Sequence, residues 1–211
     1  MVEEGKRDEL LLAVLPGVPF DGWSGQALRD GARSLGMSEA EAEDLFPRGA
    51  GDLVAWFSTW ADREMLRRTA LLPIETMKVR DRITAAFEAR QEAIEPHKEA
   101  VRRAASVLAL PQNAPLGLKL LYDTVDCMWH AAGDTATDWN FYTKRGLLAG
   151  IYSATMLYWL DDRSPGSTET RAFFQRRLAD VMSIPRVTGK MGELLDRLPN
   201  PFRFFRVAQR R

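Results

Sequence analysis

The spacing of apolar residues constrains the fold of this chain more than any other feature. Apolar side chains recur at the three- and four-residue steps that place them on one face of an α-helix, and no segment repeats the alternation typical of a half-buried strand. Turn-forming runs separate these segments, namely PGVPFDG, LPQNAP, AGD, RSPGS and SIPRVTGK. The sequence therefore predicts an all-α protein.

The predicted helices fall into three units. Residues 1–51 form a three-helix unit, residues 52–183 an antiparallel helical bundle, and residues 184–211 a linker followed by an amphipathic helix. The expected helices cover residues 6–15, 24–34, 38–46, 52–72, 74–95, 96–110, 114–132, 134–160, 167–183 and 191–210. The helix at 52–72 leaves the first unit and enters the second, so the two units need not be separable.

Charge is distributed unevenly, although the chain as a whole is neutral. Residues 186–211 carry seven basic and two acidic side chains, a net charge of +5, which leaves −5 on residues 1–185. An anionic partner would therefore meet the tail. The acidic start MVEEGKRDE has the features of neither a secretory signal nor a transit peptide, so we expect a bacterial cytoplasmic protein or a mature organellar form.

The stretch LRDGARSLGMSEAEAEDLF, residues 28–46, has the pattern of a helix-turn-helix. It places small residues at Ala32, Gly36 and Ala42, where two helices that cross over a short turn approach closely. Ser38 and Glu41 predict a capping box at the start of the second helix. This motif commonly places its second helix in the major groove of DNA.

That second helix is acidic, which is the wrong charge for DNA. Its acids are Glu39, Glu41, Glu43 and Asp44. A capping role accounts for the first two of these acids only, and DNA presents a dense row of phosphates to such a helix. Three basic residues, Arg29, Arg33 and Arg48, flank the helix without filling it. We therefore expect no nucleic-acid binding.

The stretch CMWHAAGDTATDWNFYTKR, residues 127–145, predicts a helix end at Gly133 and a new helix that begins soon after. Aromatic and charged side chains gather at this corner: Met128, Trp129 and His130 on one side, and Asp138, Phe141, Tyr142 and Arg145 on the other. Such a corner can form a binding surface, and it can equally seal a core.

Residues typical of catalysis or metal binding are sparse at this corner. Asp126 and His130 share a helix face but make half a metal site at best, and the motif of di-iron bundles is missing. Cys127 lies three residues from His130 with no third group to orient the pair. We expect no catalytic residue, no metal and no cofactor.

Residues 147–160, LLAGIYSATMLYWL, are apolar nearly all round the helix. The run is shorter than the 20 or so residues that span a bilayer. Such a helix is buried in a core, at a subunit interface or beside an apolar cavity. The residues expected to contact a lipid are Leu148, Ile151, Tyr152 and Met156.

The tail NPFRFFRVAQRR sorts arginine and phenylalanine onto opposite faces of a helix. This arrangement is typical of a helix in the headgroup region of an anionic membrane, the alternative being a helix that docks on its own bundle. We favour the membrane, with contacts from Phe202, Arg203, Phe204, Phe205, Arg206 and Arg210.

Together these stretches resemble the ubiquinone-biosynthesis accessory lipid-binding family, whose members look like TetR-type regulators that no longer act on DNA. The resemblance runs from residue 21 to residue 182, and its most specific block is MWHAAGDTATDWNFYTKR. It implies a TetR-like fold, binding of an isoprenoid quinone or its precursor, and assistance to the di-iron hydroxylase that acts late in ubiquinone synthesis.

The resemblance also implies a partner site for the hydroxylase at Met128, Trp129, Asp138, Phe141 and Tyr142, with Phe141 standing where the family pattern has Trp. We therefore expect a non-catalytic protein, peripheral on the inner face of a bacterial membrane or on the matrix side. We expect it to form a homodimer through the helices at 134–160 and 167–183. The alternative is a ligand-responsive TetR-type transcriptional regulator.

Overall fold

The computed structural model describes residues 2–133 and 139–183, and every element among them is helical. The α-helices are α1 (Val2–Val14), α2 (Val18–Asp21), α3 (Gly25–Ser34), α4 (Glu39–Leu45), α5 (Ala50–Thr69), α6 (Val79–Ile94), α7 (Lys98–Leu108), α8 (Ala114–Ala131), α9 (Trp139–Asp161) and α10 (Thr168–Ser183). Short 3₁₀ turns precede α6, α7, α8 and α10. The all-α prediction is confirmed, while the helix expected at 191–210 lies outside the described residues.

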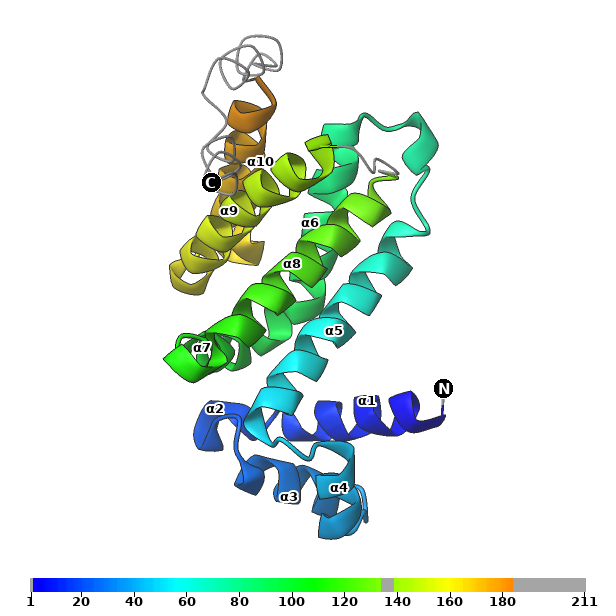
Figure 1. The fold of residues 1–211 in the computed structure, drawn as a ribbon, viewed down its shortest axis with the longest axis vertical. Helices are drawn as coiled ribbons and strands as arrows, with labels where there is room; N and C mark the ends of the chain where they lie inside the picture. The colour runs from blue at the N-terminus through cyan, green and yellow to red at the C-terminus, as the bar shows by residue number, and fades with distance from the viewer. Residues whose placement is uncertain (1, 134–138, 184–211) are drawn as a thin grey trace, which may run out of the picture.

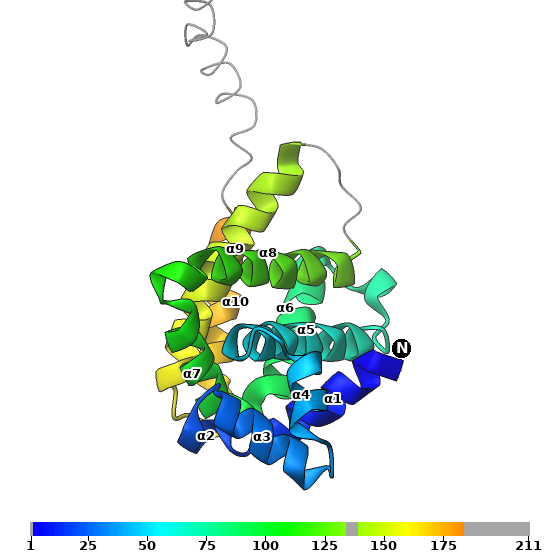
Figure 2. The same cartoon turned by 60° about the horizontal axis from the view of Figure 1, so that its bottom comes forward.

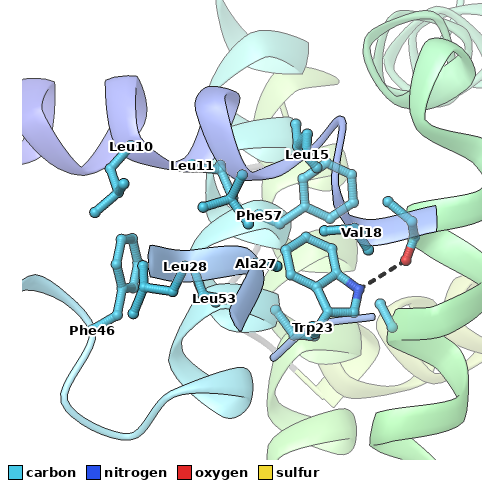
Figure 3. Packing of buried hydrophobic residues seen from close by; sticks show 14 of the residues in the cluster. Leu10, Leu11, Leu15, Val18, Trp23, Ala27, Leu28, Phe46, Leu53 and Phe57 are labelled. Carbon is cyan, nitrogen blue, oxygen red and sulfur yellow. Dashed lines mark hydrogen bonds between the residues drawn. The ribbon is translucent and has the colours of Figure 1, made fainter. Parts of the chain in front are cut away.

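Helices α1 to α4 lie together at one end of the molecule, and α5 runs from this end along the bundle (Figure 1). Their shared core includes Leu10, Leu11, Leu28 and Phe57, so it joins residues from both sides of residue 51 (Figure 3). Trp23 also reaches out of the unit, because its indole Nε1 donates to the carbonyl of Ala100 on α7 at 2.9 Å. The N-terminal unit and the bundle are therefore packed as one body.

The helix-turn-helix forms with two differences from the expected contacts. Ser38 caps α4 by accepting from the backbone N–H of Glu41 at 3.2 Å, but the Glu41 carboxylate accepts from Lys6 Nζ at 2.8 Å. Gly36 is exposed with φ +69°, so it serves the turn and not a close approach. The close approach belongs to Gly31, where a Cβ would lie 2.7 Å from Cγ2 of Val14.

Prolines account for two further differences from the predicted helices. Residues 16–22 were expected as a break, yet α2 begins at Val18 with Pro19 in its first turn, a position that needs no N–H donor. Residues 74–95 were expected as one helix, but Pro73 precedes a 3₁₀ turn at Ile74–Thr76. The extended backbone of Met77 then separates this turn from α6.

The bundle is built around α5 and α8, which run side by side in both views, with α6 packed against both (Figures 1 and 2). A second core lies between these helices, α9 and α10. Within it the rings of Phe87 on α6 and Phe174 on α10 stack with centroids 3.9 Å apart.

Helix α9 is buried on one face only, which corrects the expectation of a helix enclosed all round. Leu157 is 67% exposed and Leu147 is 44% exposed, and the small residues Gly150 and Ala154 lie between them on the same exposed face. On α10, Phe173 stacks on Tyr158 of α9 with ring centroids 4.8 Å apart. The chain thus presents an apolar α9 face to its surroundings.

Candidate functional site

A cavity of about 180 Å³ lies among α5, α6, α7, α8 and α9. Most of its wall is aliphatic or aromatic. The apolar lining comprises Val54, Phe57, Ile94, Val101, Ala104, Ala105, Leu108, Gly117, Leu120, Leu121, Met156 and the ring of Tyr152. Of these, Ala105 is exposed and Leu108, Gly117 and Leu121 are half-buried, so the cavity reaches the surface along α7 and α8.

Four polar side chains, Ser58, Arg90, Thr124 and Tyr152, gather at the buried end of this cavity. Arg90 donates through Nε to Asp62 Oδ1 at 2.7 Å and through one terminal nitrogen to the Tyr152 hydroxyl at 2.7 Å. Its other terminal nitrogen donates to Ser58 Oγ at 3.1 Å and Thr124 Oγ1 at 3.4 Å. The guanidinium therefore ties α5, α6, α8 and α9 together at one point.

Helix periodicity places this polar cluster inside the molecule. On α6 the buried residues Ile83, Phe87, Arg90 and Ile94 recur at helical spacing, so Arg90 occupies a position that the pattern assigns to the core. A buried arginine needs a paired charge and full hydrogen bonding. Asp62 supplies the opposite charge, and the Thr124 hydroxyl donates a further hydrogen bond to the Asp62 carboxylate at 3.1 Å.

Burial and charge set the protonation of this cluster. Burial opposes the charge on Arg90, but Tyr152 and Asp62 outweigh it and raise the pKa of the guanidinium, which stays protonated. Burial raises the pKa of Tyr152 above its ordinary value of 10.0, so its phenol is neutral at physiological pH. Burial likewise raises the pKa of the nearby Cys127 thiol to about 11, which makes this cysteine a weak nucleophile.

The four residues expected to bind lipid divide into two pairs. Tyr152 and Met156 line the cavity. Leu148 and Ile151 do not line the cavity and are buried in the second core, to which Tyr152 also belongs. The prediction missed Arg90 and the lining from α7. Arg90 could have been found, because it occupies an apolar position in the helical pattern of α6. No pattern in the sequence indicates that α7 lines this cavity.

The corner between α8 and α9 is only partly described. Met128 is fully buried and Trp129 is 7% exposed, so both side chains belong to the core in this conformation and not to an open partner surface. Lys144 Nζ lies over the Trp129 ring, 5.4 Å from its centroid. Asp138 and the side chains of Phe141 and Tyr142 lie outside the described residues, so the partner site stays a prediction.

Asp126, considered above as half of a metal site with His130, has another role. Its carboxylate lies 2.6 Å from Nε of Arg145, which is buried, while His130 is exposed. This ion pair links α8 to α9. Among residues 2–133 and 139–183, no three acidic, histidine or cysteine side chains are grouped so that they could hold a metal ion.

The tail predicted to bind membrane, residues 202–210, lies outside the described part of the chain. Within the described part, none of the helices has both the length and the apolar character needed to cross a membrane.

The helix-turn-helix unit followed by a helical bundle with an internal cavity defines a TetR-like protein. The structure matches the TetR transcriptional regulator from Nitrosomonas europaea with a TM-score of 0.70, over 84% of this chain and 98% of that one. At 21% sequence identity, this likeness shows the fold alone. The fold prediction is confirmed.

Sequence similarity then gives the family. Residues 114–185 match the model of the COQ9 family. The chain is 38% identical to the mitochondrial ubiquinone biosynthesis protein COQ9 of Rattus norvegicus and 37% identical to that of Homo sapiens, each over 189 residues and 86% of this chain. The resemblance found in the sequence is confirmed. The chain spans about 60% of the length of these relatives.

Proposed function

We propose that this chain is a non-catalytic accessory protein of ubiquinone biosynthesis that binds an isoprenoid quinone or its precursor at a membrane surface. In this proposal it presents the lipid to a di-iron hydroxylase. The observation that carries the proposal is the cavity itself, which combines an apolar wall with a few convergent polar groups, as small-molecule sites commonly do. The names of the COQ9 relatives support the pathway.

The cavity suits one part of a long lipid. An apolar cavity of about 150 Å³ is large enough to bind benzene. The volume here, about 180 Å³, therefore fits one substituted ring and not a long isoprenoid tail. We propose that the ring enters and that the tail leaves along α7 and α8, where Ala105 and Leu108 reach the surface.

Membrane and hydroxylase contacts complete the proposal. A very apolar quinone precursor does not diffuse through water, so its carrier has to dock on the bilayer, and the +5 tail is suited to anionic headgroups. We propose that the hydroxylase contacts the corner at Asp138, Phe141 and Tyr142. Relatives named as mitochondrial support a matrix-side location for organellar forms.

The arginines beside α4 support this proposal over DNA-dependent regulation. Arg33 pairs with Asp30 at 2.6 Å, and Arg48 pairs with Asp52 at 2.7 Å. Arg29 donates to the side chain of Gln26 at 3.0 Å. Two of the three arginines thus face an acid of the protein itself, and α4 offers acids where a DNA reader offers donors.

The test is to purify the full chain without detergent from a quinone-producing host and to analyse its organic extract by mass spectrometry. Ala104→Phe, which fills the cavity, is compared with Ala109→Phe at an exposed position of the same chain segment. We expect near-stoichiometric isoprenoid quinone or precursor in the wild type and the control, and clearly less in Ala104→Phe with unchanged circular dichroism. Folded wild type without lipid, or equal lipid in all three, would contradict the proposal.

A further inference from the structure

The buried end of the cavity is electrically balanced without any ligand. Arg90 carries one positive charge and Asp62 one negative charge, and their side chains lie 2.7 Å apart with less than a tenth of each exposed. The remaining polar groups there, Ser58, Thr124 and Tyr152, are neutral. A ligand that brought its own charge would therefore introduce an uncompensated charge.

The hydrogen bonds of this cluster leave a donor at Tyr152. Its hydroxyl oxygen accepts from Arg90, so its O–H proton is left to donate. Among the described residues, no side chain or carbonyl is placed to accept that proton, and Tyr152 is itself part of the cavity wall. Ser58 also accepts from Arg90, but it is only half-buried, and the hydroxyl of Thr124 already donates to Asp62. The cavity thus offers a phenolic donor to an acceptor oxygen.

We propose that Tyr152 recognises an acceptor oxygen on the neutral ring of the ligand, and that the Asp62–Arg90 pair selects against lipids with an anionic head. This inference rests on the proposed function, because it assumes that the cavity is the lipid site. The ligand class is a neutral ring that carries a carbonyl, ether or hydroxyl oxygen and one apolar chain, as in a benzoquinone. A fatty acid fits the apolar wall equally well, but its carboxylate would be a second buried anion beside Asp62, which is costly.

The test uses three probes with alkyl chains of nine or ten carbons, namely a decyl-substituted benzoquinone, decanoate and decylbenzene, titrated calorimetrically into the full chain at pH 7. The benzoquinone has neutral acceptor oxygens, decanoate an anionic head, and decylbenzene no acceptor. We expect the benzoquinone to bind about tenfold more tightly than decylbenzene, since a buried hydrogen bond contributes about 0.5–1.5 kcal/mol. We expect decanoate to bind at least tenfold more weakly than the benzoquinone.

The variant Tyr152→Phe removes the donor and keeps the ring. It should lower benzoquinone affinity to that of decylbenzene while leaving decylbenzene affinity unchanged. The matched control is Tyr158→Phe, which removes an exposed hydroxyl on the same helix that donates to Glu169. This control should behave as the wild type.

The outcomes separate this inference from the proposed function. If decylbenzene binds but benzoquinone binds no more tightly, or if Tyr152→Phe binds benzoquinone as the wild type does, the role of Tyr152 is overturned. Decanoate that binds as tightly as benzoquinone overturns the selection against anions. If none of the three probes binds to folded protein, the cavity is not the lipid site, and the proposed function fails together with the inference.

Discussion

At the scale of single residues, the Asp62–Arg90 pair is the feature on which both the bundle and the cavity depend. It joins α5 to α6, and through Tyr152 and Thr124 it also reaches α9 and α8. Pairing and hydrogen bonding offset the cost of taking both charges out of water. The same contacts therefore set the packing of four helices and the polarity of the cavity.

We expect Asp62→Asn to lower the free energy of unfolding by about 3–5 kcal/mol, because the substitution leaves the buried Arg90 without its counter-charge. The matched control is Asp123→Asn, which breaks an exposed i, i+4 pair with Lys119. An exposed pair of this kind contributes about 0–1 kcal/mol. Urea unfolding monitored by circular dichroism measures both. Equal small losses in the two variants would contradict the role assigned to the buried pair.

The sequence predicts the role of a residue where local pattern sets that role, and fails to predict it where helix packing does. The acidic face of α4 and the Ser38 cap follow from local pattern and are found in the structure. Of the residues predicted to contact lipid, Tyr152 lines the cavity whereas Leu148 and Ile151 do not, because helix packing decides which side of α9 faces the cavity. Arg90 was missed because its role depends on Asp62, 28 residues earlier in the chain.

At the scale of helices and turns, the close approach of α3 to α1 depends on Gly31. A Cβ at this position would lie 2.7 Å from Cγ2 of Val14 and 3.1 Å from its backbone nitrogen. Only the first of these atoms is on a side chain that can move. The packing of the helix-turn-helix on α1 therefore excludes a larger residue here.

We expect Gly31→Ala to lower stability by about 1–3 kcal/mol, the usual cost of overpacking. The control is Gly5→Ala in α1, where a Cβ would meet nothing within 4 Å and alanine favours the helix by about 1 kcal/mol. Thermal unfolding should thus move in opposite directions for the two variants. A higher midpoint for Gly31→Ala would show that α1 can shift without loss.

The turn between α9 and α10 depends on Asp162. Its carboxylate accepts from the backbone N–H groups of Ser164 at 2.7 Å and Thr170 at 3.0 Å, and from the Thr170 hydroxyl at 2.5 Å. Partial burial opposes its charge, but these hydrogen bonds outweigh it and lower the pKa of Asp162 to about 2. The ionised carboxylate therefore stabilises the folded state.

Asp162→Ala should cost about 1 kcal/mol at neutral pH, as loss of a helix cap does. Because the folded pKa is depressed, the contribution is complete above the ordinary value of 3.8 and is lost as the pH falls through about 2. The stability difference from the wild type should shrink over that range, as urea titrations at several pH values would reveal. The exposed neighbour Asp161→Ala is the control, and a difference that did not depend on pH would refute this account.

At the scale of the whole molecule, α9 leaves an apolar face exposed in a single described chain. Leu147 and Leu157 are exposed there, with Gly150 and Ala154 between them on the same face. Small residues between large apolar ones allow helices to approach closely. This arrangement supports the predicted homodimer through α9 and α10, which the likeness to a TetR regulator does not by itself establish.

We expect the wild type to be dimeric and Leu157→Glu to be monomeric in size-exclusion chromatography with light scattering, because the substitution places a charge in the apolar face. Leu118→Glu changes an equally exposed leucine on α8 and should stay dimeric. A monomeric wild type, or a Leu157→Glu variant that is still dimeric, would show that the α9 face does not form a dimer interface.

The all-α class and the TetR-like organisation were predicted from periodicity and from resemblance, since both depend on patterns repeated along the chain. The residues that line the cavity could not be predicted in this way. Its wall combines five helices, and α7 is held beside the others by the Trp23 hydrogen bond and by the core that it shares with the N-terminal helices and α5. Contacts of this kind depend on three-dimensional packing and leave no local signal.

Photolabelling can show whether the apolar cavity holds the lipid. A quinone with a diazirine in its chain is bound to the full chain, irradiated and located by peptide mass spectrometry. We expect labels on the lining segments of α7 and α8, around Leu108 and Gly117, and we expect excess unlabelled quinone to abolish them. Labels confined to the exposed face of α9, with none in the lining segments, would contradict this expectation.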